Sequence, residues 1–285
     1  MPDTITFKGN AMTLMGRKIN TGLSAPYFRV VSQDLKEITL SDFGEKIKLI
    51  SSFPSLDTPV CDLQVKEFNK RASGFSADIV VVGISKDLPF AQKRFCQENS
   101  IKNEIVLSDY RYSSFGINYG LLIKELNLLA RSVHILDKNN IVRYSQIVPE
   151  LTNAPDYEDA LKSLQDVLKG PAYKTKESLP SKCKPCEAGT PPIPKDEIEK
   201  LLARHKTWQL ADDKKITREF RFKDFVEAKY FVDMISVISE EQGHHPTITL
   251  MYNKVKITLA THVSGGLTEN DFIMAGIFDE VAASA

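Results

Sequence analysis

The sequence predicts an α/β domain with a mixed β-sheet, followed by a small α+β domain whose elements run α-β-β-α-β-β-α. A continuous Val/Ile run at residues 77–85 is typical of a central strand buried on both faces, as in a parallel sheet. Strand and helix patterns alternate up to residue 168, which favours an α/β core. From residue 195 onward, two hairpin patterns lie among three helical patterns, which indicates a small antiparallel sheet covered by helices.

Length, composition and charge limit the classes of protein to consider. The chain has 285 residues, of which 42% are hydrophobic, so it can bury a core, and its length favours two domains. A formal net charge of +0 gives no electrostatic reason to expect nucleic acid or an anionic membrane as partner. No apolar run approaches a membrane span, and residues 1–7 lack the pattern of a secretory signal. Four cysteines are too few for a disulfide-stapled secreted protein, so we expect a cytoplasmic protein with reactive thiols.

The first domain opens with a predicted hairpin at residues 4–15. Apolar residues alternate there on both sides of a Lys-Gly-Asn turn at residues 8–10. Further strands are expected at residues 28–31, 38–40 and 47–53, where β-branched and apolar residues are concentrated.

The rest of this domain continues the alternation of strands and helices. Asp87 is expected to cap a helix that follows the 77–85 strand, with Pro89 in its first turn. The later predicted elements are a strand at 104–107, an irregular segment at 110–120, a strand–turn–strand pair at 132–136 and 141–147, and a helix at 157–168 with one apolar face.

Cys61 lies between the 47–53 strand and a helical pattern, so we expect it in the first turn of a helix. A thiol there meets the positive end of the helix dipole and unpaired backbone N–H groups, which favour the thiolate form. Thr58 can donate a hydroxyl hydrogen bond to the sulfur, and Pro54 and Pro59 stiffen the turn. A lone cysteine is more often only a small buried apolar residue. The coincidence of strand, prolines, threonine and helix start favours a reactive thiol here.

Pro54, Thr58 and Cys61 form a P-x-x-x-T-x-x-C pattern that resembles the peroxiredoxins, and residues 53–61 resemble their thiol peroxidase subgroup. The resemblance implies a thioredoxin-like fold. It also implies that Cys61 attacks the peroxide O–O bond and becomes a sulfenic acid, with Pro54 and Thr58 in the substrate site. Peroxides would be the substrates, and thioredoxin or a similar dithiol the reductant.

The same resemblance assigns two further residues. Cys96, in a helical segment at 92–96 that resembles the family's, would be the resolving thiol that forms a disulfide with Cys61. Because a disulfide needs Cα atoms within about 7 Å, we expect local unfolding on oxidation. Arg131 would lie beside the Cys61 sulfur and stabilise negative charge. Taken alone, Cys96 could simply be packed in a core and Arg131 could be solvated at a strand end. His134 is expected to be a core histidine rather than a base.

Residues 169–194 have no helical or strand periodicity and are rich in Pro, Lys, Ser and Gly, which predicts a linker. This segment contains Cys183 and Cys186 in a C-x-x-C spacing. Three interpretations stay open: incidental thiols in a flexible segment, a redox pair that feeds electrons to the Cys61–Cys96 disulfide, and a zinc site. Zinc is the weakest, because a zinc site needs four ligands.

The second domain follows the expected order from residue 195. Its predicted elements are a helix at 195–206, a hairpin of strands at 208–210 and 216–222, a helix to about residue 241 capped by Asp224, a second hairpin of strands at 247–252 and 255–262, and a last helix that opens at 267–268.

Three of the five histidines cluster in the later part of this domain, at His244, His245 and His262. Each could be a packed residue, and metal binding is the rival, although no further ligand has the usual spacing. The segments 244–246, 252–259, 261–262 and 266–271 resemble the pterin-4a-carbinolamine dehydratases.

The dehydratase resemblance implies a reaction without metal or cofactor. It removes water from a 4a-hydroxytetrahydropterin and yields the quinonoid dihydropterin. His244 and His262 would act as acid and base, and His245 would bind or orient the pterin. Glu240 and Asp271 would be carboxylates that orient these groups.

We therefore predict a bifunctional cytoplasmic enzyme. Residues 1–168 would form the peroxidase domain, residues 169–194 the linker with its C-x-x-C pair, and residues 195–285 the dehydratase domain, in a chain that forms a homodimer. The alternative is a peroxide sensor whose second domain is a dimerisation or adaptor module. Rapid turnover with thioredoxin separates the two, because a sensor would react slowly and stoichiometrically.

Overall fold

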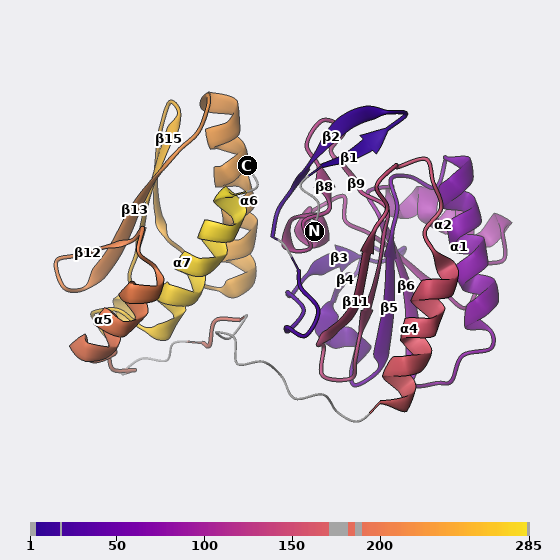
Figure 1. Ribbon diagram of the computed structural model, residues 1–285, viewed down its shortest axis with the longest axis horizontal. Coiled ribbons are helices and arrows are strands. Elements are labelled where there is room, and N and C mark those ends of the chain that lie inside the picture. The colour runs from indigo at the N-terminus through magenta and orange to yellow at the C-terminus, as the bar shows by residue number, and fades with distance from the viewer. Residues whose placement is uncertain (1–3, 18, 171–181, 186–189, 284–285) are drawn as a thin grey trace. The chain divides into compact units, whose positions relative to one another are not determined.

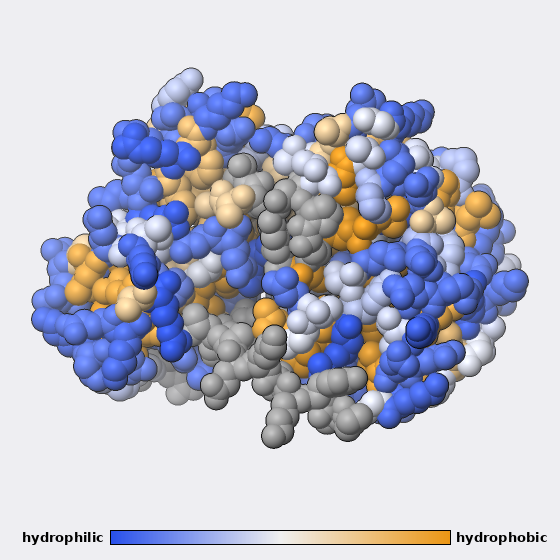
Figure 2. Space-filling view, viewed as in Figure 1, coloured by the Kyte–Doolittle hydropathy of each residue, from blue (hydrophilic) through white to orange (hydrophobic). Residues whose placement is uncertain are grey.

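A computed structural model describes residues 4–17, 19–170, 182–185 and 190–283 (Figure 1). The chain divides into two compact units, Met1–Ser178 and Leu179–Ala285. Within the described ranges, no helix is long and apolar enough to cross a membrane. Hydrophilic residues cover most of the face seen in Figure 2, with hydrophobic residues gathered in smaller areas.

The first unit is built on a seven-stranded mixed sheet in the order β11-β10-β5-β6-β7-β3-β4. The strand β6 (Ile79–Ser85) lies at its centre and pairs in parallel with β5 (Ile47–Ser52) and β7 (Ile105–Ser108). The expectation of a mixed sheet around the Val/Ile run is thus confirmed. The remaining strands pair antiparallel and are β3 (Arg29–Val31), β4 (Glu37–Thr39), β10 (Ser132–Leu136) and β11 (Val142–Ile147).

A second, four-stranded sheet in the order β1-β2-β8-β9 carries the N-terminal hairpin. The strands β1 (Thr4–Phe7) and β2 (Asn10–Met15) are joined by Lys8 and Gly9, whose φ values of 51° and 79° fit a two-residue hairpin turn. The strands β8 (Leu122–Ile123) and β9 (Leu128–Leu129) complete the sheet. Each of these two strands has only two residues, which is too short for an alternating apolar pattern to be recognised in the sequence.

Among the described residues of this unit, four α-helices and one 3₁₀ helix accompany the sheets. They are η1 (Leu40–Phe43), α1 (Pro59–Ala72), α2 (Pro89–Glu98), α3 (Ser114–Asn118) and α4 (Tyr157–Lys169). The short helix α3 occupies part of the segment that the sequence predicted to be irregular. The expectation that Asp87 caps α2 was wrong, because Leu88 holds the N-cap position. The Asp87 carboxylate instead accepts hydrogen bonds from the Leu56 backbone and the Ser55 hydroxyl, in the loop that leads to Cys61.

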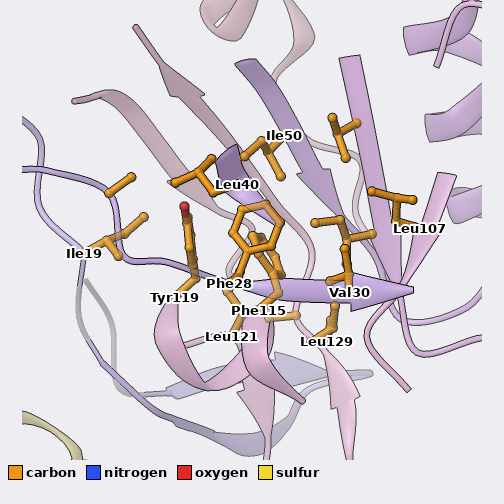
Figure 3. Close-up of a cluster of buried hydrophobic side chains, with 14 of the residues drawn as sticks. Ile19, Phe28, Val30, Leu40, Ile50, Leu107, Phe115, Tyr119, Leu121 and Leu129 are labelled. Atoms are coloured by element: carbon orange, nitrogen blue, oxygen red, sulfur yellow. The ribbon is translucent and has the colours of Figure 1, made fainter. Parts of the chain in front are cut away.

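Two apolar clusters fill the body of this unit. In the larger one the ring of Phe28 packs edge-on against Phe115 and Tyr119, among strand residues such as Val30 and Leu129 (Figure 3). The other is built around Leu49, Phe68 and Val133. A third, smaller cluster contains both Cys61 and Cys96 and is discussed with the site.

Glu104 is a buried carboxyl group of the first unit, with 5% of its surface exposed. Its Oε1 accepts a hydrogen bond from Ser51 Oγ at 3.4 Å, and its Oε2 has no partner among the described residues. A Cβ on Gly83 would stand 2.5 Å from Glu104 Oε1, so only glycine leaves room for the carboxyl. Burial raises the pKa of Glu104 well above its usual range, and the Ser51 hydrogen bond opposes this only in part.

Replacing Glu104 with Gln is therefore expected to stabilise the first unit at pH 8. A carboxyl whose pKa is raised on folding binds its proton more tightly when folded, so stability is lost as the pH rises above the unfolded value of about 4.3. The amide has no proton to lose, and the advantage of Glu104→Gln should shrink towards pH 4.5. Chemical unfolding followed by circular dichroism at both pH values checks this, and an advantage that grows with acidity would contradict it.

The second unit contains the four-stranded antiparallel sheet β12-β13-β15-β14 with helices against it. In chain order its elements are α5 (Lys195–Arg204), β12 (Gln209–Ala211), β13 (Lys215–Arg221), α6 (Phe225–Gln242), β14 (Thr247–Met251), β15 (Lys254–Leu259), η2 (His262–Ser264) and α7 (Glu269–Ala282). The predicted α-β-β-α-β-β-α order is confirmed. Asp224 caps α6 as expected, since its side chain accepts a hydrogen bond from the Glu227 backbone. The strand β15 ends earlier than predicted, and His262 opens η2 instead.

Candidate active sites

Cys61 is fully buried in the first turn of α1, directly after the loop that follows β5. Thr58 is the N-cap residue and Pro59 the first residue of the helix, where a missing N–H costs no hydrogen bond. The Thr58 carbonyl accepts from Cys61 N at 3.1 Å. The thiol thus stands at the helix end where unpaired N–H groups favour an anion.

Two side chains donate hydrogen bonds to the Cys61 sulfur. Thr58 Oγ1 lies 2.7 Å from Sγ, and Arg131 Nη2 lies 3.3 Å from it. The Thr58 hydroxyl also lies 3.1 Å from the Ser55 carbonyl, so its single proton can serve either acceptor. A charged sulfur is the stronger acceptor of the two.

Arg131 is held in place inside the protein, with 1% of its surface exposed. Its Nη1 donates to Gln64 Oε1 at 2.5 Å, and its Nε and Nη2 donate to the Leu151 carbonyl. Gln64 in turn donates from Nε2 to the Ser52 carbonyl at 3.3 Å. The alternative of a solvated arginine at a strand end is therefore wrong.

Gln64 is a residue of this site that the sequence analysis missed. It lies on the face of α1 that also carries Cys61, Val65 and Phe68, all of them buried. A polar residue on an otherwise apolar helical face was the available signal, because a buried amide needs hydrogen-bonding partners.

Cys96 lies on α2 and belongs to the same small apolar cluster as Cys61, together with Phe53, Val65 and Val106. Both cysteines are free thiols. Burial raises the pKa of Cys96, the nearby Glu104 carboxyl adds to this, and a 3.2 Å hydrogen bond from Gln33 Nε2 opposes it. Cys96 is thus disfavoured as a thiolate while α2 is folded.

The Thr58 hydroxyl provides a direct test of how the sulfur is activated. Thr58→Val keeps the shape of the side chain but removes the donor to Cys61 Sγ, so we expect peroxidase kcat/KM to fall about a hundredfold. Thr58→Ser keeps the hydroxyl and should retain most of the activity. Stopped-flow measurement of peroxide consumption compares the two variants, and equal losses would contradict a role for the hydroxyl.

The second cluster of polar residues joins α6 to α7. His244 Nε2 lies 2.8 Å from Asp271 Oδ1, and both residues are buried. Asp271 Oδ2 accepts from Thr261 Oγ1 and from the Thr268 backbone, each at 2.8 Å. The carboxylate is thus fixed from two sides and holds the imidazole in one orientation. With a proton on Nε2 directed at Asp271, the Nδ1 atom of a neutral His244 keeps its lone pair.

The other two histidines lie at the surface near this pair. His245 Nε2 lies 3.0 Å from Glu240 Oε2, and both side chains are exposed. His262 is exposed and directly follows Thr261, whose hydroxyl donates to Asp271. Hydrogen bonds therefore connect Glu240 to His245 and Asp271 to His244, while His262 is attached through the chain to the same network.

The structure describes one of the two cysteines of the C-x-x-C pair. Cys183 is buried within the second unit, with 6% of its surface exposed, which differs from the flexible segment that the sequence predicted. Cys186 lies outside the described residues. Within the part of the chain that the structure describes, no group of three His, Cys, Asp or Glu residues is arranged to hold a metal ion.

Known proteins match each unit separately. The thiol peroxidase of Staphylococcus saprophyticus subsp. saprophyticus is 51% identical over 163 residues, which is 57% of this chain and 98% of that protein. The crystal structure of a peroxiredoxin-like protein from Aquifex aeolicus is 40% identical, covers 59% of this chain and 98% of its own, and has a TM-score of 0.55. A transcriptional coactivator/pterin dehydratase from Brucella melitensis is 37% identical over 32% of this chain and 98% of its own, with a TM-score of 0.31.

Two family models match in the same order. Redoxin matches residues 20–161, and pterin 4 alpha carbinolamine dehydratase matches residues 191–281. The thioredoxin-like sheet and the buried thiol define the first unit as a peroxiredoxin. The chain belongs to the thiol peroxidase family through this unit and carries a domain of the pterin 4 alpha carbinolamine dehydratase family after it.

Proposed function

We propose that the first domain reduces hydrogen peroxide and organic hydroperoxides with Cys61 as the nucleophile. The pair of donors on the Cys61 sulfur, Thr58 Oγ1 and Arg131 Nη2, is the observation that supports this best. A thiolate is the reactive form of cysteine, and both donors stabilise it. Pro54 is buried in the loop between β5 and α1 and is proposed to shape the peroxide site.

In the first step the Cys61 thiolate attacks one oxygen of the O–O bond. An S–O bond forms, the O–O bond breaks, and the leaving oxygen takes the electron pair and a proton to become water or an alcohol. Arg131 carries a fixed positive charge into a buried site, where it stabilises the departing oxygen more strongly than it would in solution. Cys61 is left as a sulfenic acid.

In the second step Cys96 resolves the sulfenic acid. Its thiolate attacks the Cys61 sulfur, a disulfide forms, and water leaves. Because Cys96 is buried and disfavoured as a thiolate within folded α2, we propose that α2 opens locally before this step. Thioredoxin or a similar dithiol would then reduce the disulfide.

Cys96→Ser tests this sequence of steps. The variant should consume one equivalent of peroxide per chain as fast as the wild type, because the Cys61 site is intact. Turnover with thioredoxin should fall by at least about a hundredfold, because the disulfide cannot form. A variant that turns over normally would contradict the resolving role of Cys96.

For the second domain we propose the dehydration of 4a-hydroxytetrahydropterin. The C–O bond at the 4a carbon breaks, the hydroxyl leaves as water, and a ring N–H proton is lost as a C=N bond forms. His244 and His262 are proposed as acid and base, and His245 as the pterin-binding residue oriented by Glu240. The buried Asp271 that orients His244 is the observation that supports this proposal.

The chain is further proposed to form a homodimer. Apolar side chains are exposed along α6 and on β14, the edge strand of the second sheet, namely Phe225, Val226, Tyr230, Leu250 and Met251. Edge strands and exposed apolar residues favour pairing with another surface. Light scattering of the full chain checks this, and the mass of a single chain would contradict it.

A further inference from the structure

The segment that precedes the second domain is bonded to the candidate dehydratase site. Cys183 N donates to Gln242 Oε1 at 2.8 Å. The side chain of Asn270 makes a reciprocal pair with the backbone of Lys184: Lys184 N donates to Asn270 Oδ1 at 3.0 Å, and Asn270 Nδ2 donates to the Lys184 carbonyl at 2.7 Å. Residues 183 and 184 thus connect the last residue of α6 to the second residue of α7.

A second contact lies a few residues later. Ile193 N donates to the Leu267 carbonyl at 2.9 Å. A Cβ on Gly266 would stand 2.9 Å from the Pro192 side chain, so glycine lets the two segments approach. We call residues 182–185 and 190–193 the lead-in segment. It contacts the second domain at both of its described parts.

Each of these contacts falls beside a residue of the His244–Asp271 network. Gln242 lies two residues before His244, and Asn270 directly precedes Asp271. Leu267 directly precedes Thr268, whose backbone N–H donates to Asp271 Oδ2. The lead-in segment therefore contacts the chain on both sides of the 2.8 Å hydrogen bond that orients His244.

We propose that the lead-in segment is a positioning element of the dehydratase site. It clamps the end of α6 to the start of α7 and so keeps His244 and Asp271 at hydrogen-bonding distance. Gln242, Asn270 and the backbone of Lys184 are positioning residues, since they act through His244 and Asp271 rather than on the pterin. This inference rests on the proposed dehydratase activity.

Burial makes the clamp specific. Gln242 and Asn270 are both buried, so their hydrogen bonds to residues 183 and 184 are shielded from competing water while the segment is in place. By contrast, the Lys184 ammonium pairs with Glu269 at 3.4 Å in a well-exposed position, where an ion pair contributes little. The backbone of Lys184, and not its charge, should matter.

This difference supplies a matched pair of variants in the full chain. Lys184→Pro removes the N–H that donates to Asn270, whereas Lys184→Ala keeps the backbone and loses only the exposed charge. We expect Lys184→Pro and Asn270→Ala each to lower dehydratase kcat about tenfold with KM within about twofold, because a small misplacement of a catalytic group costs rate. Lys184→Ala should match the wild type.

The double variant tests whether the two substitutions act on the same contact or damage the site in two unrelated ways. If Lys184→Pro and Asn270→Ala break the same contact, the two together should cost little more than either alone. Additive losses would overturn the proposal. So would unchanged kcat in both single variants, or a loss no larger than the unfolded fraction reported by the fluorescence of Trp208, the one tryptophan of the chain.

Reactivity of the Cys183 thiol measures docking of the segment independently of activity. The thiol is buried in the structure, and we expect it to become accessible when the segment detaches. Alkylation of Cys183, followed by peptide mass spectrometry, should be faster in Lys184→Pro and Asn270→Ala than in Lys184→Ala. Equal rates would overturn the proposal whatever the activity. Failure of the proposed function would give a different result: the wild type would lack dehydratase activity, or His244→Ala would keep it. In that case the labelling rate of Cys183 alone would decide whether the segment is clamped.

Discussion

Cys61→Ser is expected to abolish peroxide reduction and to lower kcat/KM by more than about a thousandfold. A serine hydroxyl fits the space of the thiol and can still accept from Thr58 and Arg131. It is not ionised near neutral pH, however, and cannot attack the O–O bond as a thiolate does. The loss should therefore appear in the chemical step and not in folding.

The control for this variant is a cysteine in the second unit. Cys183→Ser removes a buried thiol whose described contacts to Gln242 run through its backbone, so peroxidase turnover should remain close to that of the wild type. A steady-state assay coupled to thioredoxin compares the two. Residual turnover in Cys61→Ser would contradict the assignment of the nucleophile. A loss in Cys183→Ser would instead show that the C-x-x-C pair carries electrons.

His244→Ala is expected to abolish the dehydration of 4a-hydroxytetrahydropterin, with a fall in kcat of about a hundredfold to ten-thousandfold. His244 is the histidine whose orientation is fixed by a buried carboxylate, so it has the most defined geometry for proton transfer. Asp271→Asn should cause a smaller loss, because the imidazole stays but loses its orienting charge.

His245→Ala is the informative comparison for His244. Its side chain is exposed and hydrogen-bonded to Glu240, which fits a residue that contacts the pterin. We expect KM to rise with little change in kcat, in contrast to His244→Ala. Absorbance changes of the pterin measure both constants, and identical effects of the two substitutions would contradict the separate roles.

Much of the fold follows from patterns that the residues display directly. The Val/Ile run of β6 reveals a central strand because burial on both faces favours a nearly continuous apolar run. The strands β8 and β9 were not predicted because each has only two residues, and β8 is placed by pairing with the distant strand β2. Asp87 illustrates a related limit: it stands where a capping residue should, but tertiary hydrogen bonds with Ser55 and Leu56 take its carboxylate.

Some residues of the candidate sites could likewise be predicted from local patterns, and others could not. Cys61 and Thr58 are close in sequence, so the local pattern of strand, proline and helix start indicates their contact. Arg131 and Cys96 came from the resemblance to known peroxidases, because no local pattern places them near a residue so distant in the chain. Gln64 was visible only as a polar residue on a buried face. Docking of Cys183 on Gln242 uses the backbone N–H of Cys183, which every residue except proline carries, so the identity of residue 183 does not reveal this contact.

A crossed assay shows whether this chain carries two independent active sites. Both activities are measured on the same preparations of wild type, Cys61→Ser and His244→Ala. We predict that Cys61→Ser loses peroxidase activity and keeps dehydratase activity, and that His244→Ala does the reverse. Loss of both activities from either substitution, in protein whose circular dichroism and Trp208 fluorescence match the wild type, would contradict two independent sites.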